Sequence, residues 1–440
     1  MEFTIEKWIY GGEGLARMAP DDTGRGKAVF IPFTLPGETV EADVMEERSG
    51  FARASLTRII TASEARVTPR CPYFGACGGC QYQHADYKRQ VELKRDILLE
   101  TLQRTAKIKL ECDVQLHAAE PYQYRNRTRL KVRPAPDFAV GYHRFGTNEL
   151  LPVRECPISS PLIQRAIAAL WGAGEREVST RGLREVQLFA NHDDSALLVE
   201  LYTERDTAPG SLRPFIEAIR ELVPEIAGAT VFASLPESED ERAPLTVAKY
   251  GGGAQSFGAE FLEYRTKHGE FRVSAGSFFQ TNRFLVDRLA EVALEEASGR
   301  TALDLYAGVG LFSVPLARRF DRVVAVEASP FSFRDLQHNA PENLKPVHST
   351  TERYLQNIGR KSGLDLVVLD PPRAGMGERT AKLLAQAQPP RIAYVSCDPA
   401  TLARDARVLA AAGYAITSAH LVDMFPQTAH METVLHFSRH

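Results

Sequence analysis

The sequence predicts an α/β protein whose C-terminal part, residues 273–440, is a doubly wound parallel sheet. Two observations carry this prediction. Continuous apolar runs such as TALDLYAG, DRVVAVEA and RIAYVSCD alternate with helical stretches such as ATLARDARVLAAAG, which is typical of parallel strands buried on both faces. Glycine or polar residues also follow the runs directly, and ligands of such sheets bind at the carboxyl ends of the strands.

Length and composition indicate a multidomain globular protein. A chain of 440 residues exceeds one ordinary core, and a composition of 44% hydrophobic and 25% charged residues excludes a disordered chain. No stretch approaches the roughly 20 uninterrupted apolar residues of a membrane-spanning helix. The start of the chain also lacks the pattern of a signal peptide, so we expect a cytoplasmic protein with no membrane partner. We also expect a monomer.

Residues 1–62 are expected to form a small β-barrel of the oligonucleotide-binding kind. Short runs such as FTIEKWIY and KAVFIPF alternate apolar and polar residues, and turn segments such as GGEG and LPGE separate them. A barrel this small needs every large apolar side chain that it has. We therefore expect Phe3, Trp8 and Phe30 to fill its core.

Residues 63–272 are predicted to form an α+β domain with an antiparallel sheet and a helical segment at about 85–110. Basic residues outnumber acidic ones between Phe51 and Cys156, and a strand in this region would place five basic side chains on one face: Arg125, Arg127, Arg129, Lys131 and Arg133. This stripe suits an RNA backbone, with Tyr124 or Tyr142 available for stacking. A charge-protected edge strand is the alternative.

The six cysteines are too few for a disulfide scaffold, and their clustering indicates another use. Cys71, Cys77 and Cys80 lie within ten residues, and Cys156 stands far downstream. In a reducing compartment, clustered thiols are metal ligands or catalysts before they are disulfides. Three close thiolates and a distant fourth are compatible with zinc or with an iron–sulfur cluster.

A cofactor site is predicted at the strand ends of residues 273–440. The turn DLYAGVG brings glycines to the end of the first strand, and the next strand ends at Glu327, whose carboxylate could accept ribose hydroxyls. These features suit NAD and S-adenosylmethionine equally. The sequence Asp370-Pro371-Pro372-Arg373 favours the methyl donor, because such a loop is common in enzymes that methylate bases and foreign to dehydrogenases.

Two residues are candidates for the chemistry. Cys397 ends another core strand, and the N-terminus of the helix that follows should favour its thiolate. A buried structural cysteine is the alternative. Methylation at C5 of a pyrimidine requires a nucleophile that adds to C6 and a base that removes the C5 proton. Glu432, within PQTAHMETV, is the candidate base, and the target base must be extruded from its stack.

At these residues the chain resembles the RNA uracil-5-methyltransferase family, specifically its 23S rRNA members. The resemblance rests on FFQTN at 278–282, DLYAGVG, Glu327, DPPR, SCDP and PQTAHMETV, in family order. It implies a Rossmann-like fold, and it implies that Cys397 is the nucleophile and Glu432 the proton acceptor. It also implies that four residues contact S-adenosylmethionine: Gln280, Tyr306, Glu327 and Asp370. One departure is Leu311, where many members carry asparagine, and this puts a cofactor contact of that side chain in doubt.

The resemblance extends upstream. Residues 1–62 look like a TRAM domain, an RNA-binding barrel, and the cysteine pattern looks like the family's [4Fe-4S] ligands: Cys71, Cys77, Cys80 and Cys156. In this family the helical segment at about 85–110 packs on the catalytic domain.

Three rival functions remain. A methyltransferase acting on the T-loop uridine of tRNA would use the same chemistry, and only the barrel and the cysteines argue against it. A nicotinamide-dependent oxidoreductase would not need Cys397, Glu432 or the DPPR loop. A non-catalytic iron–sulfur module that binds RNA is disfavoured because both catalytic candidates are present.

Overall fold

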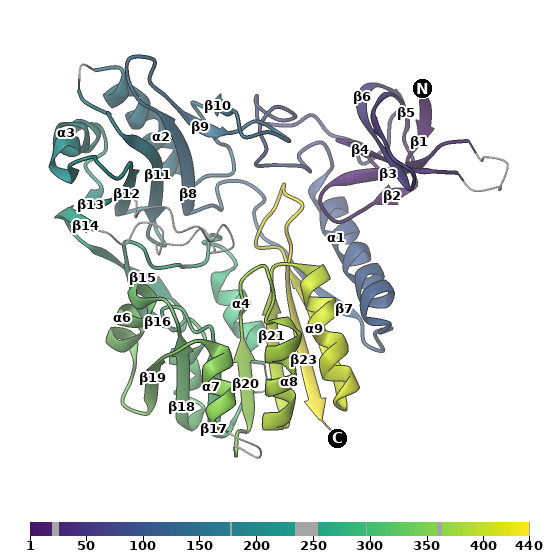
Figure 1. Cartoon of the computed structure of the whole chain (residues 1–440), viewed down its shortest axis with the longest axis vertical. Coiled ribbons are helices and arrows are strands. Elements are labelled where there is room, and N and C mark those ends of the chain that lie inside the picture. The colour runs from purple at the N-terminus through teal and green to yellow at the C-terminus, as the bar shows by residue number, and fades with distance from the viewer. Residues whose placement is uncertain (20–25, 177, 234–253, 296, 359–362, 440) are drawn as a thin grey trace.

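The computed structural model describes residues 1–19, 26–176, 178–233, 254–295, 297–358 and 363–439, and Figure 1 shows three parts. A small barrel and a central α+β part lie at one end of the C-terminal sheet. The segment that joins β22 (Tyr414–Val422) to β23 (Glu432–Arg439) of this sheet extends toward the barrel and the central part. No helix of the described residues is long and apolar enough to cross a membrane.

The C-terminal part has the predicted α/β architecture, and its sheet has eight strands, one of them from residues 114–117. In spatial order its strands are β19 (Leu344–His348), β18 (Phe320–Glu327), β17 (Gly299–Leu305), β20 (Leu366–Leu369), β21 (Arg391–Ser396), β23 (Glu432–Arg439), β22 (Tyr414–Val422) and β7 (Val114–His117). The strands from β19 to β21 are parallel, whereas β23 is antiparallel to both neighbours. The helices of this part are α4 (Val286–Ala293), α5 (Ser313–Leu316), α6 (Pro330–Asn339), α7 (Thr351–Ile358), α8 (Gly377–Ala387) and α9 (Pro399–Ala411).

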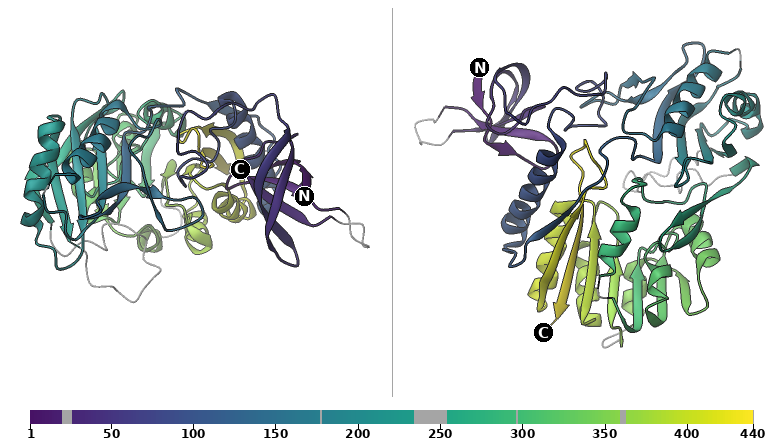
Figure 2. Two further views of the ribbon diagram at one scale, coloured as in Figure 1. Left: turned by 90° about the horizontal axis from the view of Figure 1, so that it is seen from above. Right: turned by 180° about the vertical axis from the view of Figure 1, so that it is seen from behind.

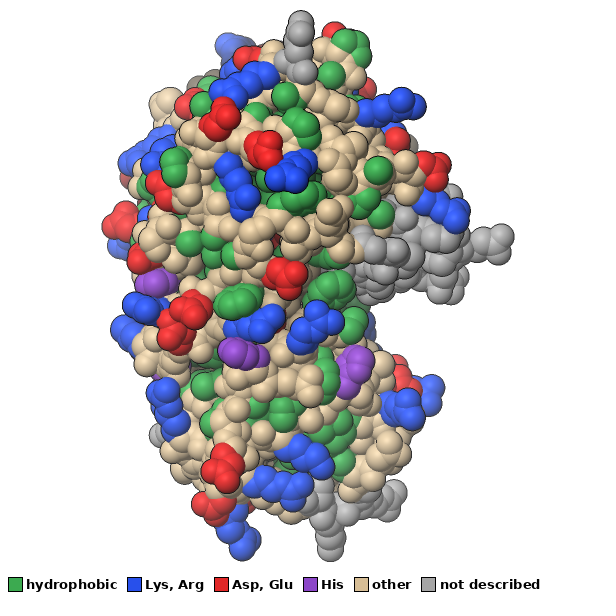
Figure 3. All heavy atoms as spheres, turned by 90° about the vertical axis from the view of Figure 1, so that its left-hand side faces the viewer, with side chains coloured by type: hydrophobic (Ala, Val, Ile, Leu, Met, Phe, Trp, Pro, Cys, Tyr) green, Lys and Arg blue, Asp and Glu red, His purple; other side chains and the backbone are tan. Residues whose placement is uncertain are grey.

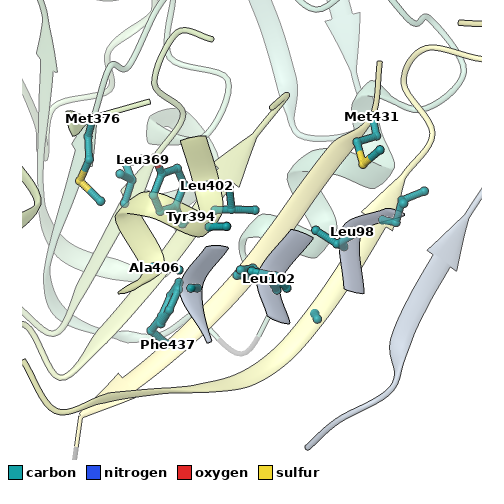
Figure 4. Packing of buried hydrophobic residues seen from close by; sticks show 14 of the residues in the cluster. Leu98, Leu102, Leu369, Met376, Tyr394, Leu402, Ala406, Met431 and Phe437 are labelled. Carbon is teal, nitrogen blue, oxygen red and sulfur yellow. The ribbon is translucent and has the colours of Figure 1, made fainter. Parts of the chain in front are cut away.

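Both faces of this sheet are buried, which explains why its strands are continuous apolar runs. Alternate residues of β20 enter different hydrophobic clusters: Val367 and Leu369 enter one, and Leu366 and Val368 the other. Figure 4 shows the first cluster, where side chains of the helical segment at residues 87–106 contact those of α9, β21 and β23.

The N-terminal barrel comprises β1 (Glu2–Thr4), β2 (Lys7–Trp8), β3 (Glu13–Arg17), β4 (Ala28–Pro32), β5 (Thr39–Glu47) and β6 (Phe51–Thr61). Phe3 is buried in the barrel core, whereas Phe30 is half-buried. The prediction that Trp8 fills the barrel core was wrong. Its indole is buried outside that core, stacked on Tyr82 with ring centroids 3.9 Å apart, because this side of the barrel packs against the segment that follows Cys80.

The central part contains a seven-stranded sheet in the order β10 (Leu150–Pro152), β9 (Ala139–His143), β8 (Arg127–Arg133), β11 (Leu183–Ala190), β12 (Leu197–Thr203), β13 (Ile226–Ala233) and β14 (Ala254–Gly258). The pairs are antiparallel except β12 with β13. Its helices are α2 (Pro161–Gly174), the turn η2 (Pro209–Leu212) and α3 (Arg213–Leu222), and a hairpin follows, β15 (Phe261–Thr266) with β16 (Gly269–Ser274).

Helix α1 (Tyr87–Thr101) and the π-helical turn η1 (Leu102–Ala106) leave the central part and pack on α9 of the catalytic sheet, beside β7 (Figure 2). The Asp86 side chain caps α1 by accepting a hydrogen bond from the backbone N–H of Arg89, at 3.0 Å. Lys94, in the middle of the helix, is completely buried, and its Nζ lies 2.6 Å from Oδ1 of Asp423. This ion pair fixes α1 to the segment that leads to Glu432.

Candidate active site

The predicted site residues meet at one edge of the catalytic sheet. Glu327, Asp370 and Cys397 lie at the carboxyl ends of the parallel strands β18, β20 and β21. Glu432 begins its strand instead of ending it. Because β23 is antiparallel to β21, with Thr433 paired to Ser396, its start lies beside the end of β21 and therefore next to Cys397.

The glycine turn after β17 forms one wall of the site. Tyr306, Gly308 and Gly310 all have positive φ angles, 61°, 56° and 102°, which make the turn tight, and glycine adopts such angles without strain. Glu327 accepts hydrogen bonds from the backbone N–H of Gly308, at 2.8 Å, and of Ser329, at 2.6 Å. Its orientation is thus set by the turn itself. Burial raises the pKa of its carboxyl.

Gln280 and Asp370 form the next contact along the edge. Nε2 of Gln280 donates to Oδ2 of Asp370 at 3.2 Å, which joins two residues that are 90 positions apart. Burial raises the pKa of Asp370 to about 7. Leu311 is buried in the hydrophobic cluster on the other side of the turn, so its side chain belongs to the core.

Cys397 is half-buried and Glu432 is buried, on neighbouring strands. Burial, followed by the charges of Glu432 and Asp370, raises the pKa of Cys397 to about 12. Burial also raises the pKa of Glu432 well above its usual range, and its Oε1 is buried without a hydrogen-bond partner. A buried unpartnered oxygen is costly, which is typical of a group that meets its partner only when a substrate binds.

The position of Cys397 before a helix N-terminus does not lower its pKa overall in the free protein. Loss of solvation and three neighbouring carboxyl groups, Glu432, Asp370 and Asp398, oppose the thiolate, and the cation of Arg373 favours it. The thiol is therefore protonated at rest.

Arg373 and His430 are two residues that the sequence reasoning did not assign. Nη2 of Arg373 donates to Nε2 of His430 at 3.3 Å, and burial with the nearby guanidinium lowers the pKa of His430 to about 4. The charge of Arg373 opposes the rise in pKa of both Cys397 and Glu432. Arg373 belongs to the DPPR motif and His430 to PQTAHMETV, so the motifs themselves could have indicated that these two residues lie in the site.

The four candidate metal ligands also gather in space. Burial raises the pKa of Cys71 to about 11 and that of Cys80 to about 12, and the neighbouring Cys156 contributes to both shifts and to that of Cys77. No three of these sulfurs lie within 4.8 Å of one another. A zinc ion with ligands at about 2.3 Å would hold them about 3.8 Å apart. The four sulfurs are therefore spaced more widely than the ligands of a mononuclear zinc site.

Among the described residues, one group of three brings its metal-ligand atoms within 4.8 Å of each other: Glu295, His420 and His436. Nε of Arg288 donates to Nδ1 of His117, so Nε2 of His117 carries the proton and donates to Nδ1 of His420, at 3.2 Å. Nε2 of His420 then donates to Glu295, at 3.1 Å. This chain of hydrogen bonds accounts for the group without a metal.

The basic side chains of β8 were expected to form a free face that binds phosphates, but three of them have partners within the protein. Arg127 pairs with Glu200 at 3.0 Å, Arg129 donates to Gln187 at 3.1 Å, and Lys131 pairs with Glu185. Tyr124 is buried, its hydroxyl on the carbonyl of Pro426, and is not available for stacking. Figure 3 shows basic and acidic side chains interspersed over one face of the molecule.

The fold and these strand-end groups define an S-adenosylmethionine-dependent methyltransferase of Rossmann-like fold. Residues 254–440 match the family described as tRNA (Uracil-5-)-methyltransferase, and residues 1–57 match the TRAM domain. A solved structure with a TM-score of 0.76 and 24% identity covers 99% of this chain and 100% of its own: the tRNA (uracil-54, C5)-methyltransferase of Pyrococcus abyssi, in complex with S-adenosyl-L-homocysteine.

Relatives extend the match over the full length. The 23S rRNA (uracil(1939)-C(5))-methyltransferase RlmD of Azoarcus sp. is 33% identical, over 99% of both chains. The protein of the same name from Salmonella choleraesuis is 32% identical, over 97% of this chain and 94% of its own. An uncharacterized RNA methyltransferase of Aquifex aeolicus is 33% identical, over 99% and 97%. The chain belongs to the family of S-adenosylmethionine-dependent RNA uracil-5-methyltransferases.

Proposed function

We propose that the protein methylates C5 of a uridine in 23S rRNA, with Cys397 as nucleophile and Glu432 as base. The observation that carries this proposal is the pair itself: a half-buried thiol at the end of β21 and a buried carboxyl with an unpartnered oxygen at the start of the adjacent β23. The rRNA substrate is supported by relatives that are 32% and 33% identical over nearly the whole chain and bear that name.

The chemistry follows from the pair. Sγ of Cys397 gives its proton to solvent and bonds as a thiolate to C6 of the extruded uracil, and the C5=C6 π electrons move toward O4 as an enolate, which makes C5 nucleophilic. C5 takes the methyl group that the bound donor supplies, and S-adenosylhomocysteine leaves. Glu432 removes the C5 proton, the C5=C6 double bond reforms, and the sulfur is released. The thiol and the carboxyl thus act in sequence on one ring.

The cofactor site is assigned to Gln280, Tyr306, Glu327 and Asp370. The carboxylate of Glu327 is held by two backbone N–H groups at the end of the second strand, where ribose hydroxyls bind in such sheets. Asp370 is supported by its strand-end position and by the amide of Gln280. Within this proposal, residues 1–62 and 63–272 contribute RNA binding, and residues 273–440 contribute catalysis.

Cys71, Cys77, Cys80 and Cys156 are assigned to a [4Fe-4S] cluster. The supporting observation is that the four half-buried thiols lie within electrostatic reach of one another, at separations wider than in a mononuclear site. When bound, the cluster would cross-link the loop after the barrel to the central sheet. Gln81 and Tyr82, directly after Cys80, donate backbone N–H groups to the carbonyl of Gln427, at 3.1 and 2.9 Å.

The test is a covalent trap. In 23S rRNA transcribed with 5-fluorouridine, C5 carries fluorine instead of the proton, so the methylated adduct cannot be resolved. With S-adenosylmethionine we expect a complex that survives denaturing electrophoresis, and we expect Cys397→Ala to abolish it completely. Cys112→Ala, at a half-buried thiol outside both sites, is the matched control and should trap normally.

Two outcomes would contradict the proposal. An adduct that persists in Cys397→Ala would remove Cys397 from its role. An adduct with 5-fluorouridine tRNA but none with the rRNA would assign the chain to the tRNA branch of the family.

A further inference from the structure

We propose that Tyr10 of the N-terminal barrel is a positioning residue of the active site, whose hydroxyl holds Asp398 and thereby the loop that carries Cys397. The inference rests on the proposed role of Cys397 and gives the barrel a task in catalysis besides RNA binding. The hydroxyl of Tyr10 donates to Oδ2 of Asp398 at 2.9 Å, across 388 positions of sequence.

The barrel turn that carries Tyr10 is fitted closely into the catalytic part. Gly12, two residues further on, has a φ of +94°, and a Cβ at this position would lie 2.7 Å from Cβ of Gln81 and 3.4 Å from that of Ala429. The backbone N–H of Ala429 in turn donates to Oε1 of the Gln81 side chain, at 3.0 Å. The turn therefore lies in a corner between the segment after Cys80 and the loop before Glu432.

Asp398 is the residue through which Tyr10 acts. Its Oδ1 caps α9 by accepting from the backbone N–H groups of Ala400, at 3.0 Å, and Thr401, at 2.8 Å. Its Oδ2 is taken by Tyr10, so both carboxylate oxygens are engaged. Ser396, on the other side of the cysteine, accepts from the backbone N–H of Asp398 at 3.3 Å. The nucleophile thus stands between two anchored neighbours.

The electrostatics agree with this placement. The pKa of Tyr10 is raised, mainly by burial and then by the charge of Asp398, its hydrogen bond to Asp398 and the charge of Cys397. The hydroxyl therefore keeps its proton and remains a donor. Glu432, Asp370 and Asp398 raise the pKa of Cys397, and Arg373 opposes them. A hydrogen bond from Tyr10 draws negative charge from Asp398 and so reduces its effect on the thiol.

Tyr10→Phe tests the inference, because it removes only the hydroxyl. At saturating RNA and methyl donor, we expect the rate of adduct formation to fall about tenfold, as for loss of one hydrogen bond to a charged group, while KM for RNA stays unchanged. In the free protein, iodoacetamide alkylation of the Cys397 peptide, followed by mass spectrometry, should require a higher pH. A merely structural role would leave that profile in place.

Two comparisons make the outcome decisive. Lys7 of the barrel forms an ion pair with Glu100 of α1, with Nζ 2.5 Å from Oε1. Lys7→Met breaks this pair without changing the loop that carries Cys397, so it should leave the alkylation profile unchanged. Adding Tyr10→Phe to Asp398→Asn should cause no further loss, because the hydroxyl acts through that carboxylate. An unchanged profile in Tyr10→Phe, the same shift in Lys7→Met, or additive losses would overturn the inference. Failure of the Cys397 trap would instead overturn the proposed function.

Discussion

Glu327 and Glu432 lie at the same edge of one sheet, yet their surroundings are opposite. Both oxygens of Glu327 accept backbone hydrogen bonds, from Gly308 and Ser329. Oε1 of Glu432 is buried without a partner, and burial and the charge of Asp370 raise its pKa well above the usual range.

This difference separates binding from chemistry. A carboxylate fixed by two backbone donors is pre-organised to accept further hydrogen bonds from a ligand without moving. A carboxyl that is buried without a partner has a raised pKa and a high affinity for a proton, which suits a group that must collect one during the reaction.

The largest effect is expected for Glu432→Gln. The amide keeps the volume of the side chain but cannot take the C5 proton, so product release should slow by about 10²- to 10⁴-fold. The adduct should still form and carry the methyl group. Rapid quenching with unmodified RNA, followed by mass spectrometry of the Cys397 peptide, measures this. Release at the wild-type rate would assign the proton to another group.

A smaller effect, of a different kind, is expected for Glu327→Ala. Loss of charge-assisted hydrogen bonds to the ribose should weaken binding of S-adenosylmethionine by at least about tenfold in calorimetry. The variant should also lose about 1–3 kcal/mol of stability, since the N–H groups of Gly308 and Ser329 lose their acceptors. Single-turnover release from a preformed adduct should be normal. Unchanged cofactor affinity would refute the assignment.

The smallest effect is a shift in a pH profile. The charge of Glu432 raises the pKa of Cys397 and so disfavours the thiolate. Glu432→Gln should therefore move the alkylation of Cys397 to lower pH in the free protein. Glu327→Ala, whose carboxylate is not among the groups that raise this pKa, should leave the profile in place. If the wild type and Glu432→Gln had the same alkylation profile, the charge of Glu432 would not influence the pKa of Cys397.

Local sequence features were enough to predict the sheet and to place three of the candidate site residues at its edge. The catalytic strands are apolar on both faces, and Glu327, Asp370 and Cys397 follow them directly, so their place at one edge follows from parallel pairing. Leu311 was flagged as a departure, and the structure places it in the core.

Other residues were misjudged because their role depends on distant partners. Trp8 was expected in the barrel core, but it stacks on Tyr82. The basic residues of β8 do share a strand face, but the acids on β11 and β12 that neutralise Arg127 and Lys131 come from strands more than fifty residues away. Lys94 interrupts an apolar stripe, and only Asp423 explains its burial.

By itself the sequence determined the alternation of strands and helices, the strand-end groups and the cysteine pattern, because each depends on neighbours along the chain. The tertiary structure decided that Glu432 meets Cys397 across an antiparallel pair, that Tyr10 reaches Asp398, and that the thiol is protonated at rest. Those features depend on desolvation and on charges contributed by other elements, and these are fixed only when the chain has packed.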